Sequence, residues 1–135
     1  MICFTLTGCH TGEKLKKNLE KEGHAVSLAT KSMYLPESIK ESTKEWAGMQ
    51  FPVSDGIIFI GAAGIAVRSI APYVQSKKSD PAVVVVDECG RFVISLLSGH
   101  LGGANALAHQ AAKILNAIPV VTTATDLQGK FAVDV

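Results

Sequence analysis

Residues 61–64 form the first of two glycine-rich loops that are suited to bind a ligand. The members Gly61, Ala62, Ala63 and Gly64 follow the apolar run 57–60, and Arg68 comes one helical turn later. Small residues let a ligand approach the backbone, and the free N–H groups of a helix start attract a carboxylate or a phosphate. Arg68 can add a bidentate contact to such an anion. The alternative is that the small residues only permit tight packing of a helix on a sheet.

Residues 98–105 form the second loop, which contains three glycines and a histidine. Glycine loses the most backbone entropy on folding, so this composition indicates a close approach to the backbone or a turn with positive φ. His100 is a candidate general acid or base, or it anchors a ligand or serves structure alone. Asn105 is a candidate hydrogen-bond partner or a helix cap. The candidate binding residues here are Ser98, Gly99, Gly102, Gly103 and Asn105.

Other chemical motifs are missing or weak. Asp87 and Glu88 are adjacent carboxylates in a turn, where solvation is the favoured interpretation, and Glu88 is the second candidate base. The stretch GCHTGEK at 8–14 follows a strand but lacks the spacing and the final Ser or Thr of a phosphate-binding P-loop. Dinucleotide and serine-hydrolase fingerprints are absent, and the histidines and cysteines lack the spacing of zinc ligands.

Composition and charge exclude several classes of protein. Of 135 residues, 47% are hydrophobic and 19% charged, which indicates one folded domain rather than a disordered chain. The net charge of +1 gives no electrostatic case for nucleic acid or an anionic membrane. The longest uncharged apolar stretch is too short to span a bilayer, and the first residues do not resemble a secretory signal. Three cysteines without a CxxC pair argue against a disulfide framework and favour a reducing cytoplasm.

Apolar runs and amphipathic segments alternate along the chain, which predicts an α/β fold. We expect three layers with a mostly parallel, Rossmann-like sheet and one β-hairpin at 83–97. The expected strands are 2–6, 25–29, 57–60, 83–86, 92–97 and 118–122, and the expected helices lie within 13–22, 36–47, 65–70 and 104–115. Residues 8–12 are expected to be a loop. A single domain covers 1–126, and 127–135 form a tail at which a further region would begin.

Both glycine loops are expected between a strand and a helix. Right-handed crossovers would place two such loops at the same end of a parallel sheet. The sequence therefore predicts that residues 61–64 and 98–103 lie side by side and line one pocket.

Three blocks of sequence carry a resemblance to a known family. They are GIIFIGAAGIAVRSIAP at 56–72, SDPAVVVVDECGRFVISLLSGHLGGAN at 79–105 and PVVTTATD at 119–126. In order and spacing they resemble the N-terminal domain of the cobalt-precorrin-5A hydrolase (CbiG) family of anaerobic cobalamin biosynthesis. Residues 1–50 contain no motif of comparable specificity.

The resemblance implies a reaction and a substrate. Members of the family open the δ-lactone of cobalt-precorrin-5A, release acetaldehyde and give cobalt-precorrin-5B. The substrate is a cobalt macrocycle with acetate and propionate arms, so cobalt belongs to the substrate and no protein cofactor or metal site is expected. The expected partners are this corrinoid and either a second copy or the family's C-terminal domain, in the cytoplasm, with no nucleic acid and no membrane.

Lactone hydrolysis needs a base for water and donors for an oxyanion. We assign His100 as the acid or base, with Glu88 second, and the backbone N–H groups of 99–103 or 61–64 as the donors. Two other classes stay open. One is a non-catalytic corrinoid-binding domain whose chemistry needs the rest of the enzyme, and the other is a small-molecule or nucleotide-binding regulatory domain.

Overall fold

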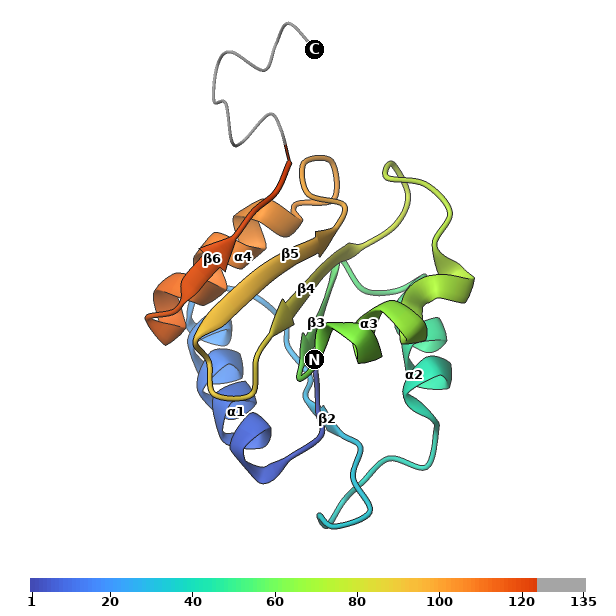
Figure 1. The fold of residues 1–135 in the computed structure, drawn as a ribbon, viewed down its shortest axis with the longest axis vertical. Coiled ribbons are helices and arrows are strands. Elements are labelled where there is room, and N and C mark those ends of the chain that lie inside the picture. Colours follow the sequence, from blue (N-terminus) through green and yellow to red (C-terminus); the bar gives the residue numbers. More distant parts are fainter. Residues whose placement is uncertain (124–135) are drawn as a thin grey trace, which may run out of the picture.

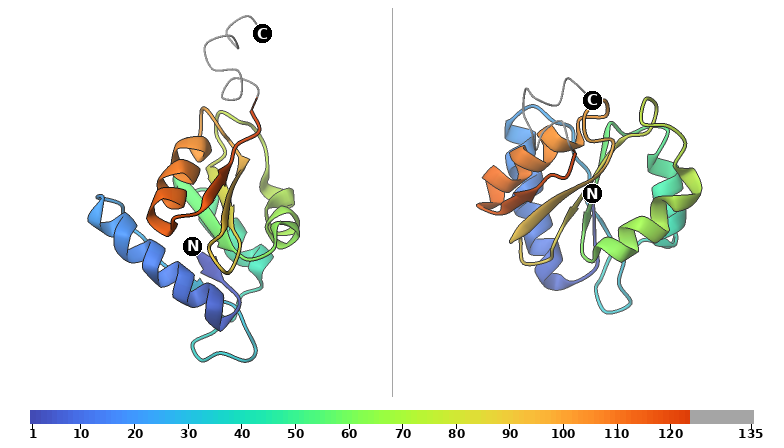
Figure 2. Two further views of the ribbon diagram at one scale, coloured as in Figure 1. Left: turned by 60° about the vertical axis from the view of Figure 1, so that its left-hand side comes forward. Right: turned by 45° about the horizontal axis from the view of Figure 1, so that its top comes forward.

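A computed structural model describes residues 1–123 and shows three layers, with a mixed sheet between two pairs of helices (Figures 1 and 2). This architecture confirms the α/β prediction. The elements in chain order are β1 (Ile2–Cys3), α1 (Leu6–Lys21), β2 (Ala29–Thr30), α2 (Thr43–Gln50), β3 (Gly56–Ile60), α3 (Ala63–Ile70), the 3-10 turn η1 (Ala71–Tyr73), β4 (Ala82–Val86), β5 (Phe92–Leu97), α4 (Ala104–Leu115) and β6 (Ile118–Val120). The tail at 127–135 and the end of the last sequence block lie outside the described residues.

The sheet has the strand order β2-β1-β3-β4-β5-β6. Strands β1 to β4 are parallel to one another. Strand β5 pairs with β4 in the antiparallel direction, with Val86 opposite Val93. Strand β6 is parallel to β5, so these two strands run opposite to the other four. The predicted hairpin is therefore confirmed, and it reverses the direction of the last two strands.

The central strands carry continuous apolar sequence because helices cover both of their faces. Val84 and Val86 belong to the core shared with α1 and α4, whereas Val83 and Val85 belong to the core shared with α2 and α3. This alternation follows the two-residue period of a strand. On the second face, the ring of Trp46 meets Phe59 edge-on at 5.8 Å between centroids.

Helix α1 begins at Leu6 and not at residue 13, so the loop predicted at 8–12 is wrong. Thr5 caps the helix, and its hydroxyl accepts a hydrogen bond from the Gly8 N–H at 3.0 Å. A Cβ at Gly12 would lie 2.8 Å from the Ile60 Cδ1 atom and 3.1 Å from Leu28 Cδ1. The glycines therefore let α1 pack closely on the sheet and do not mark a turn.

Other element boundaries also differ from expectation. Helix α2 begins at Thr43 rather than near Pro36, because Ser42 and Glu45 form a reciprocal capping box. The Ser42 hydroxyl accepts from the Glu45 N–H at 3.0 Å, and the Glu45 carboxylate accepts from the Ser42 N–H at 3.0 Å. Strand β2 is Ala29–Thr30, so it shares only Ala29 with the predicted strand at 25–29. Strand β1 ends at Cys3 rather than at residue 6, because α1 already begins at Leu6.

Cys3 and Cys9 form a disulfide, with their Cα atoms 5.4 Å apart, whereas Cys89 is free and exposed. The sequence argument against disulfides is therefore wrong for this pair. The chain turns sharply at Thr5, between β1 and α1, and this turn places Cys9 beside the end of β1. A loop at 8–12 would not fix the position of Cys9, whereas the first turn of α1 does.

Candidate functional site

The end of the sheet where β1, β3 and β4 finish, here called the carboxyl edge, is where the fold favours ligand binding. After β1 the chain returns to β2 on one side, and after β3 it returns to β4 on the other. Open α/β sheets bind ligands at such a switch point. The loops there pack closely, because a Cβ at Gly61 would lie 3.0 Å from the Phe4 ring and the Gly61 N–H donates to Val86 O at 2.8 Å.

The start of α3 at this edge is suited to bind an anion. Ala62 occupies the cap position and provides no side-chain hydrogen bond to the first N–H groups. A Cβ at Gly64 would lie 3.4 Å from both terminal nitrogens of Arg68, so the guanidinium group lies over the first turn. Residues 61–64 and Arg68 therefore come together as predicted, and they place positive charge beside uncapped N–H groups.

Glu88 lies at the same edge, in the β4–β5 turn, and is tied to α1. Its carboxylate accepts a hydrogen bond from the Thr5 hydroxyl at 2.7 Å, and its carbonyl accepts from the Thr11 hydroxyl at 2.7 Å. A Cβ at Gly8 would lie 3.6 Å from the Glu88 Cβ. The exposed carboxylate therefore stands at the start of α1, a favourable place for negative charge.

Asp87 organises the hairpin turn. Its carboxylate accepts hydrogen bonds from the N–H groups of Phe92 at 2.6 Å, Arg91 at 2.7 Å and Cys89 at 3.1 Å. Partial desolvation raises the pKa of the Asp87 carboxyl, but these hydrogen bonds and the charge of Arg91 outweigh it, so the pKa lies below its ordinary value. Asp87 thus has a structural role in the turn.

The second glycine loop lies at the opposite end of the sheet, called here the amino edge, so the prediction of one shared pocket is wrong. Gly61 is hydrogen-bonded to Val86 at the end of β4, whereas Ser98 follows Leu97, which pairs with Val83 near the start of β4. These two levels are about 10 Å apart along the strand. The hairpin reverses β5, so the loop that follows β5 emerges at the other edge. Consequently His100 and Glu88 do not share a pocket.

The loop at 98–103 adopts a backbone conformation that requires glycine at two positions. Its carbonyl groups also cap the start of α4. A Cβ at Gly102 would overlap the Ser98 Cβ, and Gly103 has a φ of 84°. The N–H groups of Ala104 and Asn105 donate to Ser98 O and Gly99 O, both at 3.0 Å. Of the N–H groups predicted as oxyanion donors in this loop, that of Gly103 donates to His100 O at 3.3 Å.

Side chains of this loop have distinct environments. The Asn105 amide accepts from the Ser95 hydroxyl at 2.6 Å and donates to the Thr123 hydroxyl at 3.1 Å, so it joins α4 to β5 and to the segment after β6. Ser98 is buried with a φ of 62°, and its hydroxyl has no hydrogen-bond partner among the described residues. His100 is exposed.

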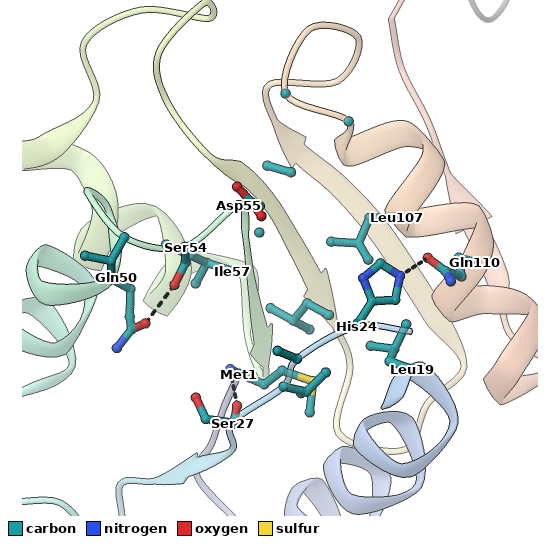
Figure 3. A pocket seen from close by; sticks show the side chains of 18 of the residues that line it. Met1, Leu19, His24, Ser27, Gln50, Ser54, Asp55, Ile57, Leu107 and Gln110 are labelled. Carbon is teal, nitrogen blue, oxygen red and sulfur yellow. Dashed lines mark hydrogen bonds between the residues drawn. The ribbon is translucent and has the colours of Figure 1, made fainter. Parts of the chain in front are cut away.

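A cavity of about 500 Å³ opens at the amino edge (Figure 3). Of the predicted binding residues, Gly102 and Gly103 line it. Hydrogen bonds on its walls join His24 Nε2 to Gln110 Oε1 at 3.2 Å and the Ser54 hydroxyl to Gln50 Oε1 at 2.8 Å. Further lining residues are Met1, Leu19, Ser27, Asp55, Ile57 and Leu107. These come from segments far apart in sequence, and no local motif marks them.

The cavity is a poor site for a poly-carboxylate ligand. Asp55 contributes a carboxylate to its wall. Burial lowers the pKa of the Met1 amino group to about 6, and that group donates to Ser27 O at 2.7 Å. Burial therefore disfavours the charged form of this amino group, which weakens it as a counter-charge to Asp55. The carboxyl edge differs in having the guanidinium group of Arg68 over the first turn of α3.

Two further classes of site are not found within residues 1–123. No group of three or more His, Cys, Asp or Glu side chains there could hold a metal ion. No helix in that part of the chain is long and apolar enough to cross a membrane.

Comparison with known proteins agrees with the sequence blocks. A family model described as cobalamin synthesis G N-terminal matches residues 45–126. A cobalt-precorrin-5A hydrolase of Salmonella typhimurium is 59% identical over 88 residues, which are 65% of this chain and 25% of that protein. A cobalt-precorrin-5A hydrolase of Priestia megaterium is 43% identical over 121 residues, or 90% of this chain and 29% of that protein. The chain thus spans about a quarter of these relatives.

A solved structure supports the fold independently of the sequence blocks. A crystal structure of a cobalamin biosynthesis protein G homolog from Sulfolobus solfataricus matches with a TM-score of 0.70 and 30% sequence identity. The match covers 90% of this chain and 35% of that one. It therefore extends the likeness beyond the family-matched segment into the first 44 residues.

Proposed function

The chain belongs to the cobalamin synthesis G N-terminal family, and from this membership we propose that it is the N-terminal domain of a cobalt-precorrin-5A hydrolase. The observation that carries the proposal is the 59% identity to the Salmonella typhimurium hydrolase, over a segment that includes most of the family match. We further propose that the complete enzyme acts in the cytoplasm, in cobalamin biosynthesis.

In this proposal the complete enzyme opens the δ-lactone of cobalt-precorrin-5A, releases acetaldehyde and gives cobalt-precorrin-5B. Cobalt enters and leaves with the macrocycle, and the chain needs no metal of its own. The part of the substrate that this domain can recognise is a carboxylate arm. The uncapped start of α3 and the guanidinium group of Arg68 support that role, because both favour a planar anion.

The acid–base residue is proposed as His100, with Glu88 as the alternative. Because these two residues lie at opposite edges of the sheet, only one of them can face the lactone. Glu88 shares its edge with the anion site, whereas His100 is exposed on the far loop. If His100 is the acid or base, His100→Ala slows acetaldehyde release and Glu88→Gln does not. If Glu88 has that role, the two variants behave the other way round.

The separation of these residues also favours a second candidate function. The anion site and Glu88 lie at one edge of the sheet and His100 lies at the other, where the N–H groups of Ala104 and Asn105 already donate to Ser98 O and Gly99 O. That arrangement suits a domain that binds the corrinoid while the rest of the enzyme supplies the chemistry.

The test compares this chain alone with a chimera in which it replaces the matching part of the Priestia megaterium hydrolase. Both are incubated with cobalt-precorrin-5A. Acetaldehyde is assayed, and retained corrinoid is measured by its absorbance after gel filtration. Acetaldehyde from the chimera supports the enzyme proposal. Corrinoid retained by the chain alone, without acetaldehyde, identifies a binding domain. An inactive chimera, together with a chain that retains no corrinoid, would contradict both.

A further inference from the structure

We propose that one face of β5 and β6 is the surface on which the polypeptide that follows this domain in the complete enzyme docks. The face, named here the β5–β6 apolar face, is the side of these strands opposite α4. Its side chains are Phe92, Ile94, Leu96, Ile118 and Val120. The inference rests on the proposed placement of the chain as an N-terminal domain, and it does not depend on the lactone chemistry.

Register and core membership place these side chains on one face. Phe92 pairs with Ile118 and Ile94 pairs with Val120, so each pair points to the same side of the sheet. Ile94 and Leu96 contact the core shared with α2 and α3, whereas Val93 belongs to the core under α4. Figure 1 shows α4 behind β5 and β6, and no helix of the described chain lies over the near side.

The pattern of side chains distinguishes this face from an ordinary solvated one. A sheet with one face in water carries polar residues on that face. Here all five outward positions are apolar, and the polar Ser95 instead points inward to Asn105. Ile118 is 59% exposed and Phe92 is 42% exposed. Phe92 and Ile118 are partners in the strand pairing, so they form one exposed apolar patch, with the half-buried Ile94, Leu96 and Val120 beside it. Exposed apolar patches mark interaction sites.

The contact is made through the face rather than through the edge of the sheet. β6 is the edge strand, and its central residue is Pro119, which has no N–H to donate to a further strand. Its three residues also offer little length for pairing. Proline and short length are devices that protect edges from strand addition. The face carries no comparable protection.

The occupant follows from the relatives. The family model describes the N-terminal part of its proteins and ends at residue 126, six residues after β6. Since the match covers 25% and 29% of the two hydrolases, most of their polypeptide follows this point. In sequence, that polypeptide begins within about six residues of the end of β6, which provides Ile118 and Val120 of the apolar face. A tether this short gives a high effective concentration for docking there.

The test measures how fast single cysteines react with a bulky maleimide. Ile118→Cys and Phe92→Cys are made separately in a Cys89→Ser background, because Cys89 is exposed. Val67→Cys, on the outer side of α3, is the matched control, since Val67 is 48% exposed. Each variant is labelled in the 135-residue chain and in the Priestia megaterium chimera. Two surface positions on the face are tested, so that the result does not depend on one variant that fails to fold.

In the chain alone we expect all three cysteines to react at similar rates. In the chimera, residues 118 and 92 should react at least about ten-fold more slowly, because labelling then requires local opening, while residue 67 keeps its rate. Unchanged rates at 118 and 92 would overturn the proposal. Protection in the chain alone that rises with its concentration would also overturn it, because a second copy would then be the occupant. A chimera that releases no acetaldehyde but protects both positions would leave the docking inference standing.

Discussion

Replacing Asn105 by alanine should destabilise the domain, although the residue was predicted from the sequence to bind substrate. The side chain is 7% exposed and joins three elements, with bonds of 2.6 Å from Ser95 and 3.1 Å to Thr123. Asn105→Ala removes both bonds and leaves two partly buried hydroxyl groups without their partner. Each such loss costs about 1–3 kcal/mol, and better helix propensity returns roughly 0.5 kcal/mol.

Both bonds are only partly buried, so we take the low end of this range for each, which gives a net loss in the free energy of unfolding of about 2 kcal/mol. For 135 residues the unfolding entropy is about 0.28 kcal/mol/K, so Tm should fall by about 7 °C. Thermal unfolding followed by circular dichroism measures this shift. Asn105→Asp keeps an acceptor for Ser95 but loses the donor to Thr123, so it should give a smaller decrease.

Asn18→Ala is the matched control. Asn18 also sits on a helix, and its amide donates only to the exposed Lys14 carbonyl at 2.8 Å. We expect its Tm to stay within about 2 °C of the original chain, as is usual for surface substitutions. If Asn105→Ala unfolds at the same temperature as Asn18→Ala, the structural role derived for Asn105 is wrong, and a role in ligand binding becomes the better explanation.

Four further predictions concern other parts of the chain. Gly102→Ala forces a Cβ into the Ser98 side chain and should lower the unfolding free energy by about 1–3 kcal/mol in a urea titration, whereas an unchanged midpoint would contradict the packing. Ser42→Ala removes the α2 capping box and should cost about 1 kcal/mol in the same titration, with no loss expected if α2 began near residue 36. Asp87→Asn should lower the free energy of unfolding at pH 7. The difference in this free energy from the original chain should shrink as the pH falls below about 4, because a carboxyl with a lowered pKa stabilises the folded state only while it is ionised. A difference that is constant with pH would refute this. In the chimera, Arg68→Ala should weaken corrinoid retention, and His100→Ala should slow acetaldehyde release by roughly 10²–10⁴-fold with retention nearly unchanged; a wild-type rate in the histidine variant would leave Glu88 or the rest of the enzyme as the source of the base.

The parts of the fold that could be predicted are those with a local signal. The run Val83–Val86, a turn with Asp87 and Gly90, and a second apolar run together indicate a hairpin, and β4 and β5 form it. The position of Arg68 over Gly64 was also predictable, because the two residues are one helical turn apart, whereas anion binding there stays a prediction. Both features depend on residues close together in the chain.

The predictions that were wrong concern features that depend on packing between distant parts of the chain. Gly8 and Gly12 resemble loop residues in the sequence, but they are glycine because α1 lies close to Ile60 and Leu28. Both glycine loops follow a strand, which predicts that they share one end of the sheet, but the hairpin reverses β5 and separates them. The amino-edge cavity depends on His24, Asp55 and Gln110 from three separate segments, and no period or motif connects them.

The strand order has a consequence for how the domain folds. From β3 onward each strand lies beside the next one in sequence, so residues 56–120 assemble through contacts of short sequence separation. Only β1, inserted between β2 and β3, requires the chain to close a long loop. Low contact order favours fast folding, and units of this kind open cooperatively. We therefore expect residues 56–120 to form first, with β1, α1 and β2 added to a finished sheet edge. Native-state hydrogen exchange should then show the amides of β1 opening before those of β4.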